Sequence, residues 1–265
     1  MGEKRIVVFR FDRDPLVCRH VIARLRMLNP GVEIHGLYGA GPGYRERVVR
    51  LGARRVLGLD SLYSLQHDGR WNWKNGDLAL LDWHKEVGRQ LDFDVVHLLE
   101  WDLLLLDPLS DVYNSVPSGA VALTCLTPVS ELIGCWTWLR EPEALRQWEM
   151  LCAHAQTHWG PTSDPVACLG VGPSFPRAFL DAYASLAPTE LCNDELRVPL
   201  AARALGFPLM DTCFRRKWAD PDEDRYFNVG GAAVDPATIS AEGHAGGRRV
   251  FHPVRQPARL QPFGA

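Results

Sequence analysis

The chain of 265 residues carries 29 Lys and Arg against 32 Asp and Glu, a formal net charge of −3, with 46% hydrophobic and 23% charged residues. These values are typical of a folded globular protein and exclude a largely disordered chain. The nearly balanced, interspersed charges argue against nucleic acid or an anionic membrane as an electrostatic partner. The most apolar run, residues 94–107, is interrupted by His97, Glu100 and Asp102. We therefore expect a soluble protein with no membrane span.

The cysteines and the N-terminal segment indicate the compartment. Seven cysteines, an odd number without a CxxC pair, fall mostly in apolar segments. This pattern predicts buried thiols in a reducing cytoplasm rather than disulfides or a zinc site. The basic start is followed by a short apolar run, Ile6 to Phe9, and then by charge. We read this run as a first strand and not as a signal peptide.

Residues 1–60 alternate between β-rich runs and helical periodicity. Asp14 and Pro15 predict a helix start, and Asn29 marks its end. The predicted elements are, in order, a strand Arg5–Phe11, a helix between Asp14 and Asn29, a strand Val32–Tyr38, a glycine-rich loop 39–43, a short helix Arg45–Leu51 and a strand Arg55–Leu59. Such alternation predicts an α/β fold with parallel strands.

The next segment contains the most informative strand. A helix is expected to begin at Asp77, and Val95–Leu99 is nearly continuous apolar sequence, as in a strand buried on both faces of a parallel sheet. Later elements are less regular: a strand Ala120–Thr124, a helix from Pro142, a strand Ala167–Val171, a helix Pro176–Leu186, a helical run from Asn193 to Leu205, a strand Gly206–Asp211, and loops at Asp220–Arg225 and Asp235–Arg249. Without repeats or a linker, residues 1–265 are expected to form one domain with two functional halves, 1–125 and 126–265.

Glu100 and Asp102 follow the buried strand. Residues i and i+2 of an extended segment point to the same side, so the two carboxylates are expected to converge while Trp101 points away. Ligands of open α/β sheets bind beyond the carboxyl ends of the strands, where this pair falls. Carboxylate oxygens there suit Mg²⁺ or Mn²⁺ on a substrate diphosphate. The alternative is that both acids are simply solvated at a strand end.

The acidic triplet, the strand–helix–strand opening and a late histidine in the sequence VFHPVR together resemble the GT-A fold of nucleotide-sugar glycosyltransferases. The resemblance implies a Rossmann-like, mostly parallel sheet flanked by helices in a single domain. It implies that Asp102 holds the divalent metal, that Glu100 reaches the metal, the ribose or the donor sugar, and that His252 completes the metal shell. The chain departs from the pattern in having Glu100 where the first Asp is usual.

The same resemblance implies a catalytic base. Inverting members place an Asp or Glu at the start of a helix in the second half, and here Asp194 and Glu195 occupy that place. A carboxylate there would deprotonate the acceptor hydroxyl. The alternative is that Asn193 and Asp194 are ordinary helix caps.

The nucleotide is expected over the ends of the first and third strands. The residues expected to contact base, ribose or phosphate are Arg10, Asp12, Asp60, Lys74, Glu100 and Trp101. The GAGPG loop has the wrong spacing and position for a dinucleotide fingerprint and is read as a tight turn.

Two further groups are weaker candidates. His154 and His158 have a helical spacing that can bind metal, but a packed helix face is the more plausible interpretation. Trp136 and Trp138 could stack on a sugar or an aromatic acceptor, or could be core residues.

Together with these residues, the resemblance implies a cytoplasmic, Mn²⁺- or Mg²⁺-dependent glycosyltransferase that moves a sugar from a UDP- or GDP-sugar to a small-molecule or glycan acceptor. Two alternatives stay open. A nucleotidyltransferase shares the layered architecture but usually has a glycine-rich loop after the first strand, which the segment FRFDRDP lacks. A non-catalytic nucleotide-sugar-binding or scaffold protein would keep the fold with a degenerate site.

Overall fold

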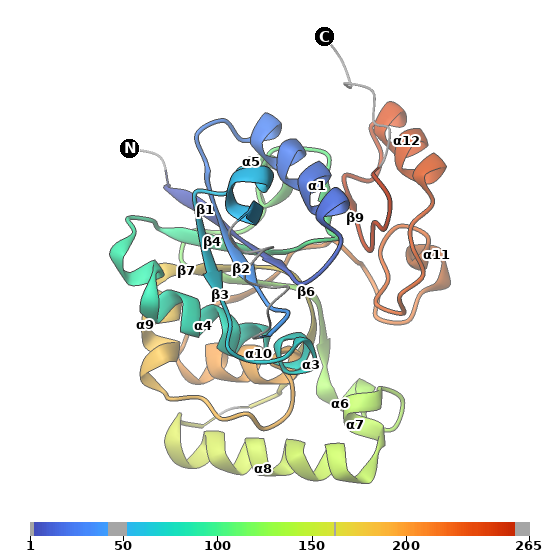
Figure 1. Ribbon diagram of the computed structural model, residues 1–265. Helices are drawn as coiled ribbons and strands as arrows, with labels where there is room; N and C mark the ends of the chain where they lie inside the picture. The colour runs from blue at the N-terminus through green and yellow to red at the C-terminus, as the bar shows by residue number, and fades with distance from the viewer. Residues whose placement is uncertain (1–2, 42–51, 162, 258–265) are drawn as a thin grey trace.

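The computed structural model describes residues 3–41, 52–161 and 163–257. Within them, the main sheet has seven strands in the order β3-β2-β1-β4-β7-β6-β8. The strands are β1 (Arg5–Phe11), β2 (Glu33–Tyr38), β3 (Ser61–Ser64), β4 (Val95–Glu100), β6 (Val121–Pro128), β7 (Val166–Pro176) and β8 (Leu209–Asp211). The main sheet flanked by helices confirms the predicted α/β fold in one domain (Figure 1).

Strand direction brings particular strand ends to one edge of the sheet. The pairs β3–β2, β2–β1, β1–β4 and β6–β8 are parallel, whereas β7 runs antiparallel to both β4 and β6. In the parallel register, Arg10 lies opposite Glu100. The carboxyl ends of β1 and β4 therefore open onto the same edge, and the sheet is mostly parallel, as predicted.

Helices cover both faces of the sheet. Helices α1 (Pro15–Leu28) and α5 (Leu109–Val112) lie on one face, and α4 (Gly76–Glu86), α9 (Arg177–Ser185) and α10 (Asp194–Ala204) lie on the other (Figure 1). Val7 and Phe9 join the core on the α1 side, whereas Ile6 and Val8 join the core on the α10 side. This alternation follows from the two-residue period of a strand buried on both faces.

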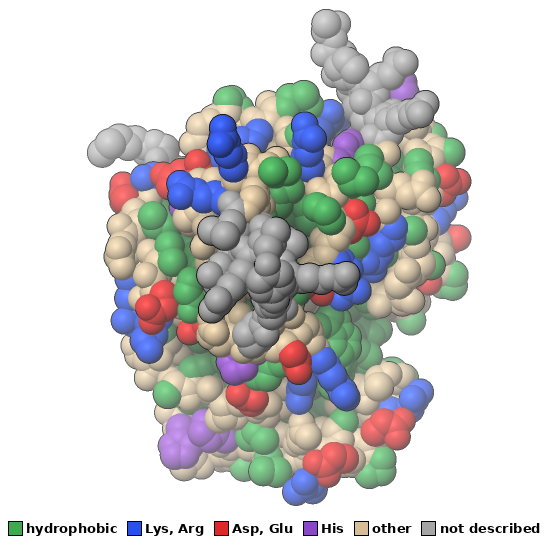
Figure 2. Space-filling model, viewed as in Figure 1, with side chains coloured by type: hydrophobic (Ala, Val, Ile, Leu, Met, Phe, Trp, Pro, Cys, Tyr) green, Lys and Arg blue, Asp and Glu red, His purple; other side chains and the backbone are tan. Residues whose placement is uncertain are grey.

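The remaining elements extend these layers. They are α3 (Gly69–Lys74), a 3₁₀ helix Gly88–Gln90, β5 (Leu104–Leu105), α6 (Val129–Leu132), α7 (Thr137–Arg140), α8 (Pro142–His158), α11 (Pro221–Asp224), α12 (Pro236–Ala245) and β9 (Val250–Phe251). Strands β5 and β9 pair antiparallel as a separate two-stranded sheet, which ties the C-terminal segment to the chain after β4. Acidic and basic side chains are interspersed on the face seen in Figure 2, in keeping with the near-neutral charge.

The prediction of a third strand at Arg55–Leu59 was wrong. Residues 52–57 are helical, and the strand begins only at Ser61. Ala53 and Leu57 are both buried, and their spacing of four places them on one helix face, so the segment follows helical periodicity. The predicted helix Arg45–Leu51 and the end of the glycine-rich loop lie outside the described residues.

Both predicted loops contain helices. Asp220 accepts a hydrogen bond from Asp222 N at the start of α11, and Asp235 accepts one from Ala237 N at the start of α12. Each cap is followed by proline in the first turn, as at Asp14 and α1. Strand β7 also runs past the predicted end to Pro176, so α9 begins at Arg177.

In the described part of the chain, no helix combines the length and the apolar character that a bilayer crossing requires.

Candidate active site

A cavity of about 700 Å³ opens beyond the carboxyl ends of β1 and β4. Its lining joins segments far apart in sequence, because β7 passes the end of β4 and the C-terminal segment folds back over it. It contains most of the residues that the sequence singled out: Arg10, Asp12, Lys74, Glu100, Trp101, Asp102, Asp194, Glu195 and His252. The roles predicted for these residues remain predictions, but the structure places them around one space.

Asp60 does not line this cavity. It precedes β3, and its carboxylate accepts hydrogen bonds from Ile34 N at 2.7 Å and from Arg26 Nη2 at 2.6 Å. Because β3 starts after Asp60, where a strand had been predicted to end, the residue lies at the amino ends of β2 and β3, at the opposite edge of the sheet. The prediction that Asp60 contacts the nucleotide is therefore corrected to a structural role.

Glu100 is held by a cation and by the backbone. Its Oε1 accepts a hydrogen bond from Arg10 Nη2 at 3.1 Å, and its Oε2 accepts one from Gly172 N at 3.0 Å. Burial raises the pKa of the Glu100 carboxyl, while Arg10 and the Gly172 N–H oppose that rise. Both carboxylate oxygens thus have partners within the protein.

Asp102 has different partners from Glu100. Residues 101 and 102 form a turn, closed by the hydrogen bond from Leu103 N to Glu100 O, so the geometry expected for an extended segment does not hold. Trp101, expected to point away, also lines the cavity. Asp102 Oδ1 lies 3.5 Å from His252 Nε2, and Oδ2 lies 3.2 Å from Arg255 Nη2. Asp102 therefore pairs with His252 and Arg255, whereas Glu100 pairs with Arg10 and the backbone.

The His252 ring is fixed by a backbone carbonyl. Its Nδ1 lies 2.7 Å from Asn228 O, and because a carbonyl oxygen only accepts, Nδ1 carries the hydrogen. In the neutral ring, Nε2 then presents its lone pair towards Asp102. A histidine held in this way has the arrangement typical of metal ligands.

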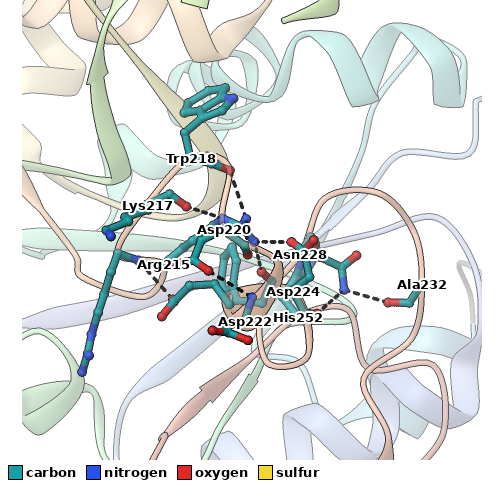
Figure 3. Close-up of polar contacts among 12 residues, drawn as sticks. Arg215, Lys217, Trp218, Asp220, Asp222, Asp224, Asn228, Ala232 and His252 are labelled. Carbon is teal, nitrogen blue, oxygen red and sulfur yellow. Dashed lines mark hydrogen bonds and ion pairs between the residues drawn. The ribbon is translucent and has the colours of Figure 1, made fainter. Parts of the chain in front are cut away.

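Arg215 anchors the loop that positions Asn228 and His252 (Figure 3). Its guanidinium donates hydrogen bonds to the carbonyls of Lys217, Trp218, Asp220 and Phe227 and pairs with Asp224. Asn228 Nδ2 in turn donates to Asp224 O at 3.0 Å and to Ala232 O at 2.9 Å. This anchor was not predicted, because an arginine between apolar and loop residues does not by itself indicate one.

Asp194 and Glu195 form the first turn of α10 and face the cavity half-buried. Asp194 Oδ2 accepts a hydrogen bond from Gly76 N at 3.1 Å. Glu195 Oε1 accepts one from Gly170 N at 2.9 Å, and its Oε2 accepts one from Asn193 Nδ2 at 2.8 Å. Asn193 stands at the cap position without a side-chain cap bond, so the helix-capping alternative does not account for these polar residues.

The surroundings of both acids favour their protonated forms. Burial raises the pKa of Asp194 well above its usual range, and the neighbouring Asp77 and Glu195 add to the rise. Burial likewise raises the pKa of Glu195 to about 7, against the opposing effect of the Gly170 N–H. Acids with such raised pKa values are typical of groups that transfer protons near neutral pH.

A buried ion pair beneath the acids links α4 to α10. Arg197 donates to Asp77 at 2.8 and 2.6 Å and to Asn75 Oδ1 at 3.0 Å, and Tyr183 Oη donates to Asp77 Oδ2 at 2.5 Å. Arg197 is fully buried. The helix was predicted to begin at Asp77, but it begins at Gly76 and Asp77 serves this pair. In the sequence, an arginine between Leu196 and Val198 on an apolar helix was the feature that could have indicated this buried ion pair.

Three glycines let the backbone approach the acids. A Cβ at Gly76 would collide with Arg10 Nη1 and would lie 2.6 Å from Asp194 Oδ2. A Cβ at Gly170 would lie 3.3 Å from Glu195 Cγ, and Gly172 has a φ of +66° beside Phe214. These positions were not identified from the sequence.

The two histidines at helical spacing on α8 remain a surface pair. The His154 and His158 rings lie 4.5 Å apart, and His154 also makes an edge contact with Trp159. Among the residues that the structure describes, no group of three or more His, Cys, Asp or Glu side chains could hold a metal ion. A metal at the cavity would therefore need ligands from outside the protein in addition to Asp102 and His252.

Comparisons with known proteins leave the family open. No family profile and no curated protein matches the chain. Among solved structures, it is similar to the apo structure of the bifunctional glycosyltransferase WbbM, with 9% identity and a TM-score of 0.40 over 80% of this chain. It is also similar to the galactosyltransferase LgtC in complex with donor and acceptor sugar analogues, with 11% identity and a TM-score of 0.40 over 83% of this chain.

The chain covers 39% of the WbbM chain and 74% of the LgtC chain.

Proposed function

We propose that this protein is a glycosyltransferase that moves a sugar from a nucleotide diphosphate sugar to an acceptor hydroxyl. One observation carries the proposal: a single cavity brings together the Asp102–His252 pair and the Asp194–Glu195 pair. The first pair suits a cation on a diphosphate, and the second suits a proton acceptor. Neither pair alone would distinguish this activity from simple ligand binding.

Asp102 and His252 are the proposed protein ligands of Mn²⁺ or Mg²⁺. The 3.5 Å between Asp102 Oδ1 and His252 Nε2 is compatible with two ligands on one ion, and Asn228 O holds the imidazole in the tautomer that a metal needs. Such ions keep few protein ligands and take the rest from substrate phosphates and water. When bound, the ion would act as a Lewis acid that stabilises the departing diphosphate. Glu100, with both oxygens occupied, is proposed to hold Arg10 rather than the metal.

The nucleotide is proposed to lie against Asp12 and Trp101. The Asp12 carboxylate, paired with Arg13 Nη2 at 2.5 Å, is a candidate acceptor for a ribose hydroxyl. Arg255 lies over the Trp101 ring, 4.8 Å from its centre, and reaches Asp102, so it is placed to pair with the diphosphate. Lys74, the other predicted phosphate ligand, lies with its Nζ 6.0 Å from the centre of the Trp138 ring. The donor is proposed to be a UDP- or GDP-sugar.

Asp194 is the proposed catalytic base. The structure gives its Oδ1 no hydrogen bond from a described residue, whereas both oxygens of Glu195 are engaged. In an inverting displacement, the acceptor oxygen forms the new bond to the anomeric carbon while the bond to the diphosphate breaks. The acceptor proton passes to Asp194, and the bonding electron pair leaves with the diphosphate. Burial, Asp77 and Glu195 raise the pKa of Asp194, and Arg10 and Arg197 oppose that rise, which increases the ionised fraction that this step requires.

In the proposed function, residues 1–125 hold the nucleotide and the metal, and residues 126–265 hold the acceptor and supply the base. The tail of the second half would bring His252 back to the metal. A cytoplasmic location is part of the proposal. The seven cysteines are free thiols, and Cys18, Cys125, Cys168 and Cys192 are buried.

A thermal-shift screen of nucleoside diphosphates with and without Mn²⁺ tests the donor site. A ligand that binds only the folded state raises the melting temperature, so UDP or GDP should do so only when Mn²⁺ is present. Release of the nucleoside diphosphate from the matching nucleotide sugar then tests catalysis. Binding without release across several acceptors would favour the scaffold alternative, and no shift with any nucleotide would contradict the proposal.

A further inference from the structure

One wall of the cavity carries three tryptophans. Trp73 from α3 and Trp138 from α7 lie with ring centroids 5.7 Å apart at an interplanar angle of 38°. Trp136 lines the same cavity and makes an edge contact with Trp218, with ring centroids 4.8 Å apart. The three indoles therefore present apolar faces and edges to the space next to the acid pair.

This wall is not ordinary core packing. Trp73 is 64% exposed, whereas Trp83, Trp148 and Trp159 are buried. Trp136 and Trp138 contact the core and also line the cavity. An exposed indole at the rim of a cavity is typical of a binding site, because it offers a large rigid apolar face at a small entropic cost.

A second, more polar groove of about 440 Å³ adjoins the wall, and Lys74 lines both spaces. Its other lining residues come from α8 and from the loop before α10: Glu143, Arg146, Gln147, Met150, Thr189, Glu190 and Leu191. Lys74 and Arg146 balance Glu143 and Glu190, and Arg146 Nη2 pairs with Glu143 at 2.8 Å. The groove therefore offers hydroxyl-binding groups without net charge.

We propose that the acceptor is a neutral glycan of at least two sugars. Its terminal sugar would stack its C–H face on Trp73 and Trp138, with the reacting hydroxyl towards Asp194, and the following sugar would lie in the polar groove. The role of the glycan as an acceptor rests on the proposed function, but binding of the glycan can be tested without the donor. A lipid or an aryl acceptor fits less well, because five of the eight residues that line the space beyond the tryptophans carry charged or amide side chains.

Isothermal titration calorimetry on the full chain, without nucleotide, tests this site. The probes are glucose, galactose and N-acetylglucosamine, the di- and tetrasaccharides built from them, and phenyl β-glucoside. We expect saturable binding of at least one disaccharide, about tenfold tighter than its monosaccharide. Failure of every di- and tetrasaccharide to bind, or tighter binding of phenyl β-glucoside than of any disaccharide, would overturn the inference.

Variants assign the binding to the wall and the groove. Trp138→Ala should weaken oligosaccharide binding about tenfold or more, and Trp138→Phe should retain most of it, because a ring can still stack. Gln147→Ala should weaken binding of disaccharides and longer chains but not of monosaccharides. Met27→Ala, which shortens a side chain on α1 that is 57% exposed, is the matched control and should bind as the wild type does.

Unchanged oligosaccharide binding by Trp138→Ala would place the glycan elsewhere and overturn the inference. Failure of the proposed function gives a different result. The wild type would then bind glycans in the calorimeter but would show no Mn²⁺-dependent thermal shift with UDP or GDP and no nucleoside diphosphate release.

Discussion

The backbone N–H of Gly76, the first residue of α4, donates a hydrogen bond to Asp194 Oδ2, at the start of α10, over 3.1 Å. Beneath this contact, Arg197 and Asp77 join the same two helices through a buried ion pair. The proposed base is thus positioned by a contact between helix N-termini that are 118 residues apart in the chain. Because a base must lie within hydrogen-bonding reach of the acceptor hydroxyl, this contact should matter for turnover.

Gly76→Ala should lower kcat about 100-fold, because displacements of about 1 Å at a catalytic group can cost that much. The added Cβ would collide with Arg10 and crowd Asp194 Oδ2. Gly52→Ala is the matched control, since a Cβ there meets nothing within 4 Å. Steady-state kinetics of both variants would check this, and equal activity of the two would contradict the proposed placement of Asp194.

Asp102→Ala should abolish Mn²⁺-dependent turnover and remove the Mn²⁺-dependent thermal shift with UDP or GDP. The change removes the only carboxylate that contacts His252 in the described residues. Asp92→Ala, at a side chain 95% exposed, controls for the loss of one acidic charge. Retained turnover with normal Mn²⁺ dependence in the Asp102 variant would exclude the proposed metal site.

Asp194→Asn should lower kcat by about 10²- to 10⁴-fold, the usual contribution of a general base. In the wild type, kcat/KM should fall as the pH drops below the raised pKa of the acid pair, because the base must be ionised. A pH profile from about pH 5 to about pH 9 checks this, and the acid limb should vanish from the residual activity of the variant. An acid limb that persists unchanged would assign it to another group.

Glu195→Gln should stabilise the protein at alkaline pH and have little effect in acid. Burial raises the folded-state pKa of Glu195 from 4.5 to about 7, so the fold favours the protonated form. The stability from this preference is complete below the unfolded-state pKa and is lost as the pH rises through about 7. Glutamine stays neutral, and rotation of the Asn193 amide would let its unpartnered Oδ1 accept from the new amide. Melting temperatures across this window should diverge with rising pH, whereas a constant difference would contradict the assignment.

Arg197→Met should cost about 3–5 kcal/mol of unfolding free energy, because it leaves Asp77 buried without its ion-pair partner. The double variant Asp77→Asn with Arg197→Met should lose less than the sum of the single changes. Urea denaturation of the four proteins measures both quantities. Strict additivity would mean that the two side chains do not depend on each other.

Local signals were sufficient for the elements that build the site. The apolar run Val95–Leu99 predicted β4, and Asp14 with Pro15 predicted the start of α1. Most of the cavity residues could then be predicted, because the carboxyl ends of parallel strands lie at the same edge of a sheet. The same Asp-Pro signal at Asp220 and Asp235 was outweighed by the surrounding Gly, Pro and Ala, and two short helices were taken for loops.

The partners of each acid could not be predicted. Glu100 and Asp102 were expected to act together, but a turn after Glu100 gives one to Arg10 and the other to His252 and Arg255. That separation depends on Gly172 and on the returning C-terminal segment, which lie 72 and about 150 residues away. Asp60 was misplaced for a related reason, because one wrong strand moved it from one edge of the sheet to the other.

Strand β7 has a consequence for how the site tolerates substitution. Gly170 and Gly172 hold Glu195 and Glu100 through their main-chain N–H groups, which every amino acid except proline also carries. What the acids require from β7 is therefore the path of its backbone and the lack of side chains there, not a particular functional group.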